Sequence, residues 1–192
     1  MNNPFVGFAP WIIFWVVSSP SSWEWATLGA LLAAVILAVP SAERGSLKIL
    51  ELGSIAFFGV LSVLAIFLDR ADLGWVEDYS QAISSGALAL IALGSLAFMP
   101  FTEQYARESA PREVWDSPVF KQTNRLLTTA WGGVFLVSAI LGVIAQEVDS
   151  STAREWLNWI IPIALVVGAF KFTAWYAQQV RGRAAPATAD TR

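Results

Sequence analysis

The chain has 192 residues, of which 56% are hydrophobic and only 14% are charged, and its formal net charge is −3. A soluble domain carries about 25% charged residues, so this composition is typical of an integral membrane protein. Cysteine and histidine are both absent, which excludes disulfides, thiolate ligands and histidine-ligated metal or haem. We therefore expect no cofactor, and the negative net charge argues against nucleic acid as a partner.

Six apolar runs predict the fold, because a membrane-spanning helix requires about 20 predominantly apolar residues. The runs cover residues 5–18, 23–39, 47–68, 79–99, 118–146 and 156–180. They predict an all-α polytopic membrane bundle of six transmembrane helices, forming one domain over residues 1–180. The first run is short and Pro10 interrupts it, so the alternative is five spans plus a re-entrant first segment. Residues 181–192 are predicted to be a disordered cytoplasmic tail.

Local signals place several helix ends. Pro40 is expected to end the second run, and the pair Ser117-Pro118 is typical of an N-cap followed by the first helical residue. Pro162 is expected to kink the last run. Residues 69–78 and 147–155 are predicted to be acidic loops. Small residues such as Ala30 in the second run and Ala82 and Gly86 in the fourth predict faces of close helix packing.

The distribution of Lys and Arg predicts the orientation. With six spans and the N-terminus inside, ten of the twelve basic residues fall in inside segments, and only Arg70 and Arg154 lie outside. Positive residues favour the cytoplasmic side. The chain is therefore predicted to lie in the cytoplasmic (inner) membrane with both termini inside and with the loop 100–125 in the cytoplasm.

Few residues in the apolar runs carry charge. Glu51 stands in the first turns of the third run, where a carboxylate marks either an ion path or an interfacial ion pair with Lys48, three residues earlier. The second interpretation is favoured, and the shallow depth suggests that Glu51 is dispensable for folding. Lys171 in the last run is expected to extend its ammonium to the inner surface rather than to bind an ion.

The loop 100–125 is a candidate cytoplasmic contact surface. As a contact surface it would place its aromatic residues at headgroup depth with the charges facing water. The favoured interpretation is a loop that satisfies its own ion pairs, such as Glu103 with Arg107, because mixed charges favour self-pairing. The candidate contact residues are Phe101, Tyr105, Arg107, Trp115, Phe120 and Arg125.

Two short motifs resemble a known family. The residues Val114-Trp115, Phe120, Asn124-Arg125-Leu126, Thr129-Ala130-Trp131-Gly132 and Phe135, with the early stretch 9–15, resemble the intracellular septation protein A family. The spacing between Trp115 and Asn124 is longer than in that family's pattern. The segment 100–108 is also similar to uncharacterised bacterial membrane proteins with a PFT-x-QYARE segment. The resemblance implies a small inner-membrane protein associated with the envelope or division machinery, without known catalytic residues.

These observations predict a non-enzymatic integral membrane protein that acts through helix or protein contacts. Its expected partners are the lipid bilayer and other membrane proteins or a second copy of itself. The alternative is a small oligomeric transporter or channel for an ion or small solute, using Glu51 or Lys171. An enzyme is not expected, because the sequence offers no convergent set of titratable or nucleophilic groups.

Overall fold

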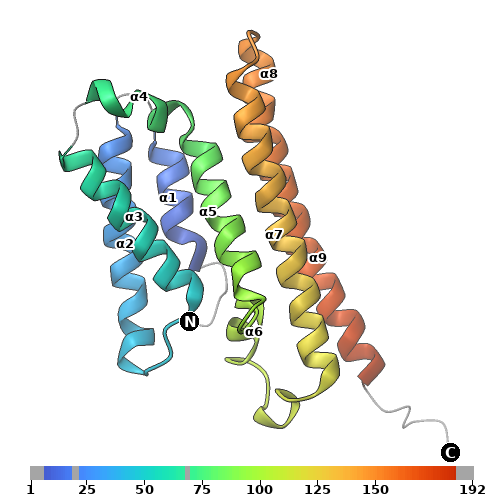
Figure 1. Cartoon of the computed structure of the whole chain (residues 1–192). Coiled ribbons are helices and arrows are strands. Elements are labelled where there is room, and N and C mark those ends of the chain that lie inside the picture. Colours follow the sequence, from blue (N-terminus) through green and yellow to red (C-terminus); the bar gives the residue numbers. More distant parts are fainter. Residues whose placement is uncertain (1–6, 19–21, 68–69, 185–192) are drawn as a thin grey trace, which may run out of the picture.

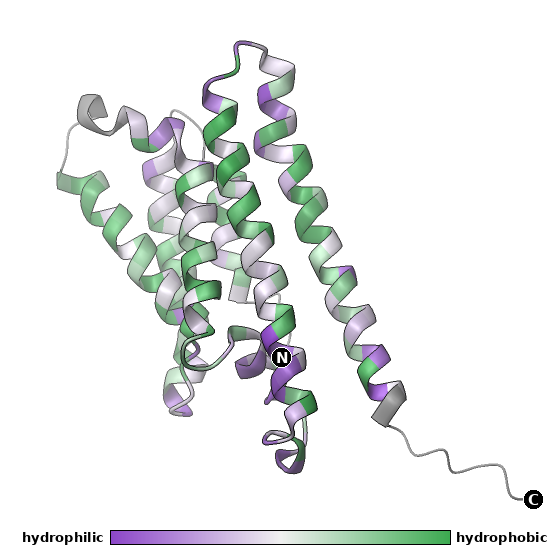
Figure 2. Ribbon diagram, turned by 45° about the vertical axis from the view of Figure 1, so that its right-hand side comes forward, coloured by the Kyte–Doolittle hydropathy of each residue, from purple (hydrophilic) through white to green (hydrophobic). Residues whose placement is uncertain are grey.

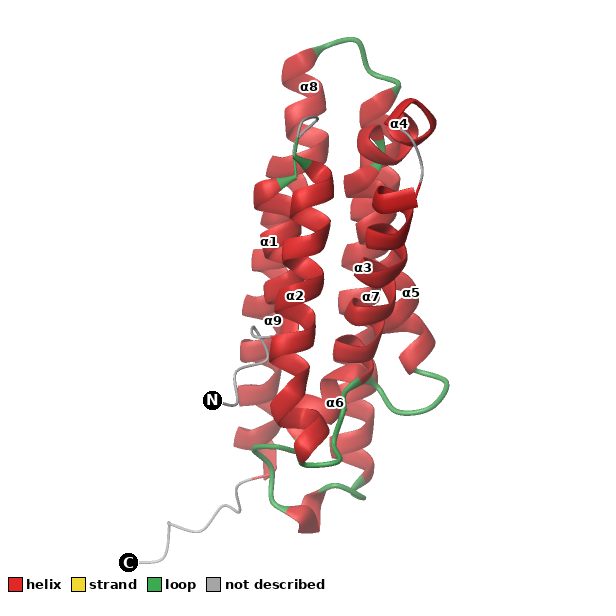
Figure 3. Cartoon of the chain, turned by 90° about the vertical axis from the view of Figure 1, so that its left-hand side faces the viewer, coloured by secondary structure: helices red, strands yellow, loops and turns green. Residues whose placement is uncertain are grey.

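The computed structural model describes residues 7–18, 22–67 and 70–184, and every regular element in these ranges is helical. Figure 3 shows the long helices running side by side along one direction, with short loops between them. In chain order the elements are α1 (Ala9–Val17), α2 (Trp23–Glu43), α3 (Ile49–Phe67), α4 (Arg70–Asp78), α5 (Ser80–Ser95), α6 (Phe101–Ala106), η2 (Arg112–Val114), α7 (Pro118–Gln146), α8 (Ser151–Glu155), η3 (Trp156–Ile160) and α9 (Ile161–Ala184) (Figure 1).

Four helices of the described chain are long and apolar enough to cross a membrane. They are α2, α3, α7 and the continuous helix Ser151–Gly182, which comprises α8, η3 and most of α9. The apolar helix α5 has 16 residues, and α1 has nine. Nine residues rise only about 14 Å, roughly half the thickness of the bilayer core. The all-helical prediction is confirmed for the described residues, and the long apolar helices support a membrane-embedded protein, but the count of six spans is not confirmed.

Polar residues gather at the two ends of the bundle. In Figure 1 the α2–α3 connection, α6 and the end of α9 lie at one end, which we call the α6 end, while α4 and α8 lie at the opposite α4 end. Figure 2 shows hydrophilic residues concentrated at these ends and hydrophobic residues along the helices between them. The α2–α3 connection, with Arg44 and Lys48, and the loop 100–125 both lie at the α6 end, and we call them the basic connections.

The short helix α1 packs one face into the bundle, and its other face, with Ile12, Val16 and Val17, is exposed. Its Trp11 and Phe14 are almost fully buried and pack against Phe58 of α3. Phe8, which precedes α1, stacks on Trp131 of α7 with 5.3 Å between ring centroids. Pro10 does not interrupt this helix. It stands in the first turn, where a missing backbone N–H leaves no hydrogen bond unmade.

Two indole groups connect α1 to later helices. Trp11 Nε1 donates a hydrogen bond to Ser54 Oγ of α3 at 2.7 Å, and Trp15 Nε1 donates to Ser84 Oγ of α5 at 2.9 Å. A buried indole N–H requires an acceptor, since leaving it unpaired costs free energy. These bonds therefore fix the position of α1 along the bundle axis.

Replacing Ser54 by alanine is expected to lower the free energy of unfolding by roughly 1–3 kcal/mol, because the buried N–H of Trp11 loses its acceptor. Ser62 lies on the same helix and is also buried, but its hydroxyl has no hydrogen-bond partner among the described residues. Ser62→Ala is therefore the matched control and should be neutral or slightly stabilising. Thermal unfolding of both variants in one detergent measures the difference. Equal stability of the two would show that the Trp11–Ser54 bond contributes nothing.

Small residues bring α5 and α7 close together. A Cβ added to Gly142 of α7 would lie 3.0 Å from backbone atoms of Ala82 in α5, and one added to Gly132 would contact Leu93. Ala82 is buried, as the predicted packing face requires, and Ala30 of α2 is also fully buried. The predicted face holds over the first part of α5, whereas Gly94 is exposed with no atom near its Cβ position.

Three helix boundaries differ from the sequence-based predictions. Pro40 lies inside α2, which continues to Glu43, because a helix in a membrane bundle tolerates an internal proline. Residues 70–78 form the helix α4 rather than a loop, and its Val76 is buried against the bundle. The last helix continues to Ala184, past the predicted start of the tail, and residues 185–192 lie outside the described part.

The predicted irregularity near Pro162 is present. The five residues Trp156–Ile160 form a π-helical turn, in which the N–H of Ile161 bonds to the carbonyl of Trp156. Proline has no N–H to offer the carbonyl four residues earlier, so the regular hydrogen-bond pattern breaks in the turn before it. The wider π turn lets the helix continue into α9 without a stop.

Candidate functional site

The first candidate site is a polar group around the buried Lys48 at the α6 end, which we call the Lys48 cluster: Ser41, Lys48, Glu51, Tyr105 and Glu108. The α2–α3 connection positions two of its members. Gly45 adopts a φ of 63°, which only glycine reaches without strain, and the chain then turns into α3. Glu51 accepts a hydrogen bond from the backbone N–H of Lys48 at 3.0 Å, as the third residue of a capping box does.

The Lys48 ammonium is enclosed by partners. Its Nζ lies 2.8 Å from a carboxylate oxygen of Glu108, 3.3 Å from one of Glu51 and 3.4 Å from the hydroxyl of Ser41. The side chains of Lys48 and Glu51 are only 8% and 10% exposed. The Ser41 hydroxyl also donates to Glu51 at 2.9 Å. The predicted pair between Lys48 and Glu51 is present, but it is buried and joined by a second carboxylate from beyond α6.

Tyr105 of α6 forms one side of the cluster. The Lys48 Nζ lies 4.9 Å from the centroid of its ring, within the range of a cation–π contact. Its hydroxyl is buried beside Gly7, where a Cβ would collide with it, and has no hydrogen-bond partner among the described residues. Burial, followed by the charges of Glu51 and Glu108, raises the pKa of this hydroxyl above its ordinary value. The phenol therefore stays neutral at physiological pH.

A second ion pair folds the loop 100–125 onto itself. Arg107 donates to the buried carboxylate of Glu103 at 2.6 Å, the predicted spacing of four residues. The guanidinium carbons of Arg107 and Arg112 lie 5.1 and 5.7 Å from the ring centroid of Trp115. Phe101 is buried and meets Phe8 edge to face, so it does not lie at the surface as expected. These contacts agree with the favoured prediction, a loop that satisfies its own ion pairs.

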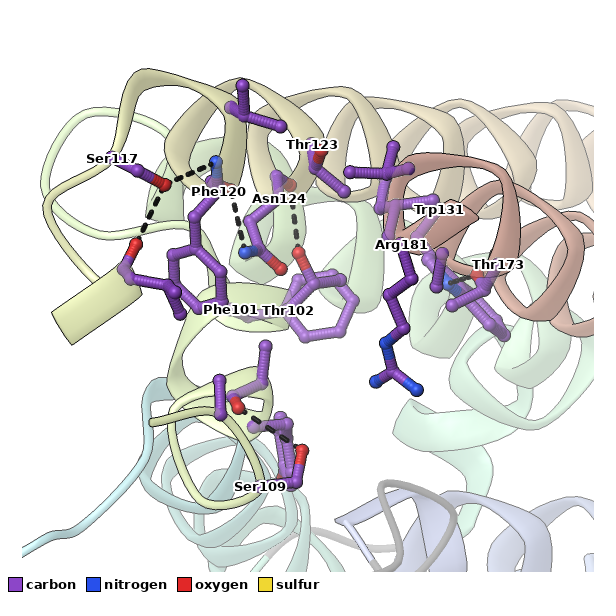
Figure 4. Close-up of a pocket in the computed structure, with 18 of the residues that line it drawn as sticks. Phe101, Thr102, Ser109, Ser117, Phe120, Thr123, Asn124, Trp131, Thr173 and Arg181 are labelled. Carbon is purple, nitrogen blue, oxygen red and sulfur yellow. Dashed lines mark hydrogen bonds between the residues drawn. The ribbon is translucent and has the colours of Figure 1, made fainter. Parts of the chain in front are cut away.

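The second candidate site is a pocket of about 830 Å³ between α6, the following loop, α7 and α9, which we call the α7–α9 pocket. Figure 4 shows side chains from these segments converging on it. Its walls are mainly apolar and aromatic, and one lining residue carries a charge. The lining residues are Phe8, Phe101, Thr102, Tyr105, Ala106, Ser109, Ala110, Pro111, Val114, Ser117, Val119, Phe120, Thr123, Asn124, Leu127, Trp131, Phe170, Thr173, Ala177, Val180 and Arg181.

Several polar groups of the α7–α9 pocket already have partners. The Thr173 hydroxyl donates to the carbonyl of Ala169 at 2.8 Å and accepts from Trp131 Nε1 at 3.1 Å. The Asn124 amide nitrogen donates to the carbonyl of Phe120 at 2.9 Å. These bonds hold the lining in place and reduce its capacity to bind a polar ligand. Pockets of roughly 300–1,000 Å³ with apolar walls and few polar groups are typical of small-molecule sites.

The predicted site residues lie in the Lys48 cluster, in the lining of the α7–α9 pocket, or outside both. Lys48 and Glu51 belong to the Lys48 cluster, whereas Lys171 is exposed on α9 and lines neither site. Arg125 is exposed and donates to the carbonyl of Leu96 at 3.4 Å, beside the end of α5. The predicted loop residues that line the α7–α9 pocket are Phe101, Tyr105 and Phe120.

Sequence reasoning missed Ser41 and Glu108 in the Lys48 cluster and Thr173 and Arg181 in the α7–α9 pocket. Ser41 of α2 and Glu108, which follows α6, lie far apart in the sequence. Thr173 and Arg181 share α9, but no sequence pattern shows that they face α6 and α7. The Glu51 side chain is 10% exposed although it stands in the first turn of α3, and its expected dispensability for folding stays a prediction.

Within the described ranges no group of three or more acidic residues is arranged to hold a metal ion. Comparison of the chain with protein-family models, with curated proteins and with solved structures finds no match. The resemblance to the intracellular septation protein A family therefore stays a prediction.

Proposed function

We propose that this chain is a non-enzymatic integral membrane protein that holds an amphipathic molecule in the α7–α9 pocket. The observation that carries the proposal is the pocket itself: about 830 Å³, with aromatic walls, between helices of which two have the length and composition of membrane spans. An apolar chain that enters such a pocket buries its own apolar surface and that of the walls, and this burial favours binding.

The charged residues favour binding over transport or catalysis. Lys48 and Glu51 were the candidates for an ion path, yet both are held in ion pairs with each other and Glu108. Neither lines the pocket, and Lys171 is exposed on α9. The Lys48 cluster is therefore better explained as a set of ion pairs that stabilises the contact between the α2–α3 connection and the α6 segment. The resemblance to the septation family would set this binding role in the cell envelope.

We further propose that the α6 end faces the cytoplasm, since the basic connections gather there. The chain contains no cysteine, so single cysteines can be introduced without background. Ser109 at the α6 end and Ser151 at the α4 end are both exposed. In intact bacteria an impermeant maleimide is expected to label Ser151→Cys, and to label Ser109→Cys only after permeabilisation. Labelling of position 109 from outside would reverse the orientation.

The binding role is tested by filling the pocket from α9. Ala177 lines the pocket, whereas Ala174, one turn earlier on the same helix, is exposed and does not. Ala177→Phe is expected to weaken the binding of a dansyl-labelled fatty acid roughly tenfold, a loss of about 1.4 kcal/mol, because the new ring occupies the space of the chain. Dansyl emission measured against protein concentration in detergent gives the affinity.

Ala174→Phe is the matched control and should bind the labelled fatty acid as the wild type does. Equal affinities for all three proteins would contradict the proposal, as would the absence of saturable binding to the wild type. Thermal unfolding of both variants establishes that each is folded.

A further inference from the structure

We infer that the molecule held in the α7–α9 pocket is an anionic phospholipid of the surrounding membrane, with an acyl chain in the pocket and its phosphate against Arg181. This inference rests on the proposed binding function and adds the chemistry of the headgroup. Three observations carry it: the single charge in the lining, the engagement of the neighbouring carboxylates, and the position of the pocket beside membrane-length helices.

Among the described residues that line the pocket, Arg181 alone is charged. It stands near the end of α9 and is exposed. Figure 4 shows its guanidinium extending from α9 into the space facing α6, with no hydrogen bond to the other residues drawn. A guanidinium presents a planar set of donors that matches two oxygens of a phosphate, so it recognises this group better than an ammonium does.

Two acidic residues near the pocket are already paired. Glu103 is bound by Arg107, and Glu108 is bound by Lys48. Neither carboxylate lines the pocket. The lining therefore has a net positive charge at the α9 side, and an anionic group complements it. A zwitterionic headgroup would place its own cation near Arg181 and gain less.

The apolar walls identify the rest of the ligand. Aromatic rings from Phe8, Phe101, Phe120, Trp131 and Phe170 surround the interior. A free phosphate ion would gain nothing from these rings, whereas an acyl chain would bury its surface against them. The helices α7 and Ser151–Gly182 meet the length and composition of membrane spans. A bilayer lipid can therefore reach the gap between them without passing through water.

The test compares phosphatidylglycerol with phosphatidylcholine, each carrying the same NBD-labelled acyl chain, and measures NBD emission with the full-length protein in a nonionic detergent. The wild type is expected to bind the anionic lipid roughly tenfold more tightly, as one charge-assisted contact allows. Arg181→Gln should weaken the binding of phosphatidylglycerol roughly tenfold and that of phosphatidylcholine much less, so that the two affinities become similar. Lys171→Gln, which removes an exposed cation of the same helix, should preserve the wild-type preference.

Two results would overturn the inference. The first is that the wild type binds both lipids equally and Ala177→Phe weakens the binding of both. The pocket would then bind amphipathic molecules without recognising their headgroups. Displacement of the lipid by millimolar inorganic phosphate would identify a free anion as the ligand. If Ala177→Phe leaves the binding of both lipids unchanged, the proposed function itself fails, so the two failures are distinguishable.

Discussion

Replacing Lys48 by methionine is expected to lower the free energy of unfolding by roughly 3–5 kcal/mol, the cost of leaving a buried charge without its partner. Methionine keeps most of the length of the side chain but removes the ammonium that lies between Glu51 and Glu108. Glu51 would keep its bonds from the Ser41 hydroxyl and the backbone N–H, which places the expected loss toward the lower end of this range. Thermal or denaturant unfolding in detergent measures it.

Lys171→Met is the matched control, because Lys171 is exposed on α9 and its loss should change stability little. The double variant Lys48→Met/Glu108→Gln is informative as well. Neutralising Glu108 removes one of the two carboxylates left without a cation, so part of the stability should return. If Lys48→Met is as stable as Lys171→Met, the Lys48 cluster does not hold α6 to the α2–α3 connection.

Replacing Gly142 by leucine is expected to cost roughly 1–3 kcal/mol of unfolding free energy through overpacking. The nearest neighbours of a Cβ at this position are the backbone N, the Cα and the Cβ of Ala82, all at 3.0 Å. A flexible side chain could rotate away, but a helix backbone cannot, so α5 and α7 must separate. The loss of close contact along this interface would lower the unfolding temperature.

Gly133 of the same helix offers the control for this substitution. It is exposed, and no atom lies within 4 Å of its Cβ position. Gly133→Leu should therefore be neutral or slightly stabilising, because leucine has a higher helix propensity than glycine. Wild-type stability of Gly142→Leu would mean that α5 and α7 tolerate a wider separation.

Features that depend on neighbouring residues were predictable from the sequence. The start of α7 is an example: Ser117 accepts a hydrogen bond from the N–H of Phe120, and Pro118 is the first helical residue, as predicted. The ion pairs of Lys48 with Glu51 and of Glu103 with Arg107 also follow from their spacing. In each case the partners lie within four residues, so one helical turn brings them together.

Features that depend on helix packing were not predictable from the sequence. The apparent polarity of the loop 100–125 suggested a surface segment, yet Phe101 and Glu103 are buried because α6 turns back against α7. The α7–α9 pocket requires Arg181 of α9 to lie opposite residues of α6, a juxtaposition that no sequence period encodes. Proline alone did not predict where a helix ends. Pro10 was expected to interrupt a helix but stands in the first turn of α1, and Pro40 was expected to end α2 but lies inside it.

The hydrogen bonds from α1 to later helices have a consequence for biosynthesis. Trp11 and its acceptor Ser54 are 43 residues apart in the chain, and Trp15 and Ser84 are 69 apart. At about 5–20 residues per second, the ribosome makes the acceptor of Trp15 roughly 3–14 s after the indole itself. During this interval α1 has none of its hydrogen-bonding partners from α5 and rises through only about half of the bilayer core. Nascent chains that end before α5 should therefore keep the Trp11–Ser54 bond but leave the Trp15 indole without its acceptor.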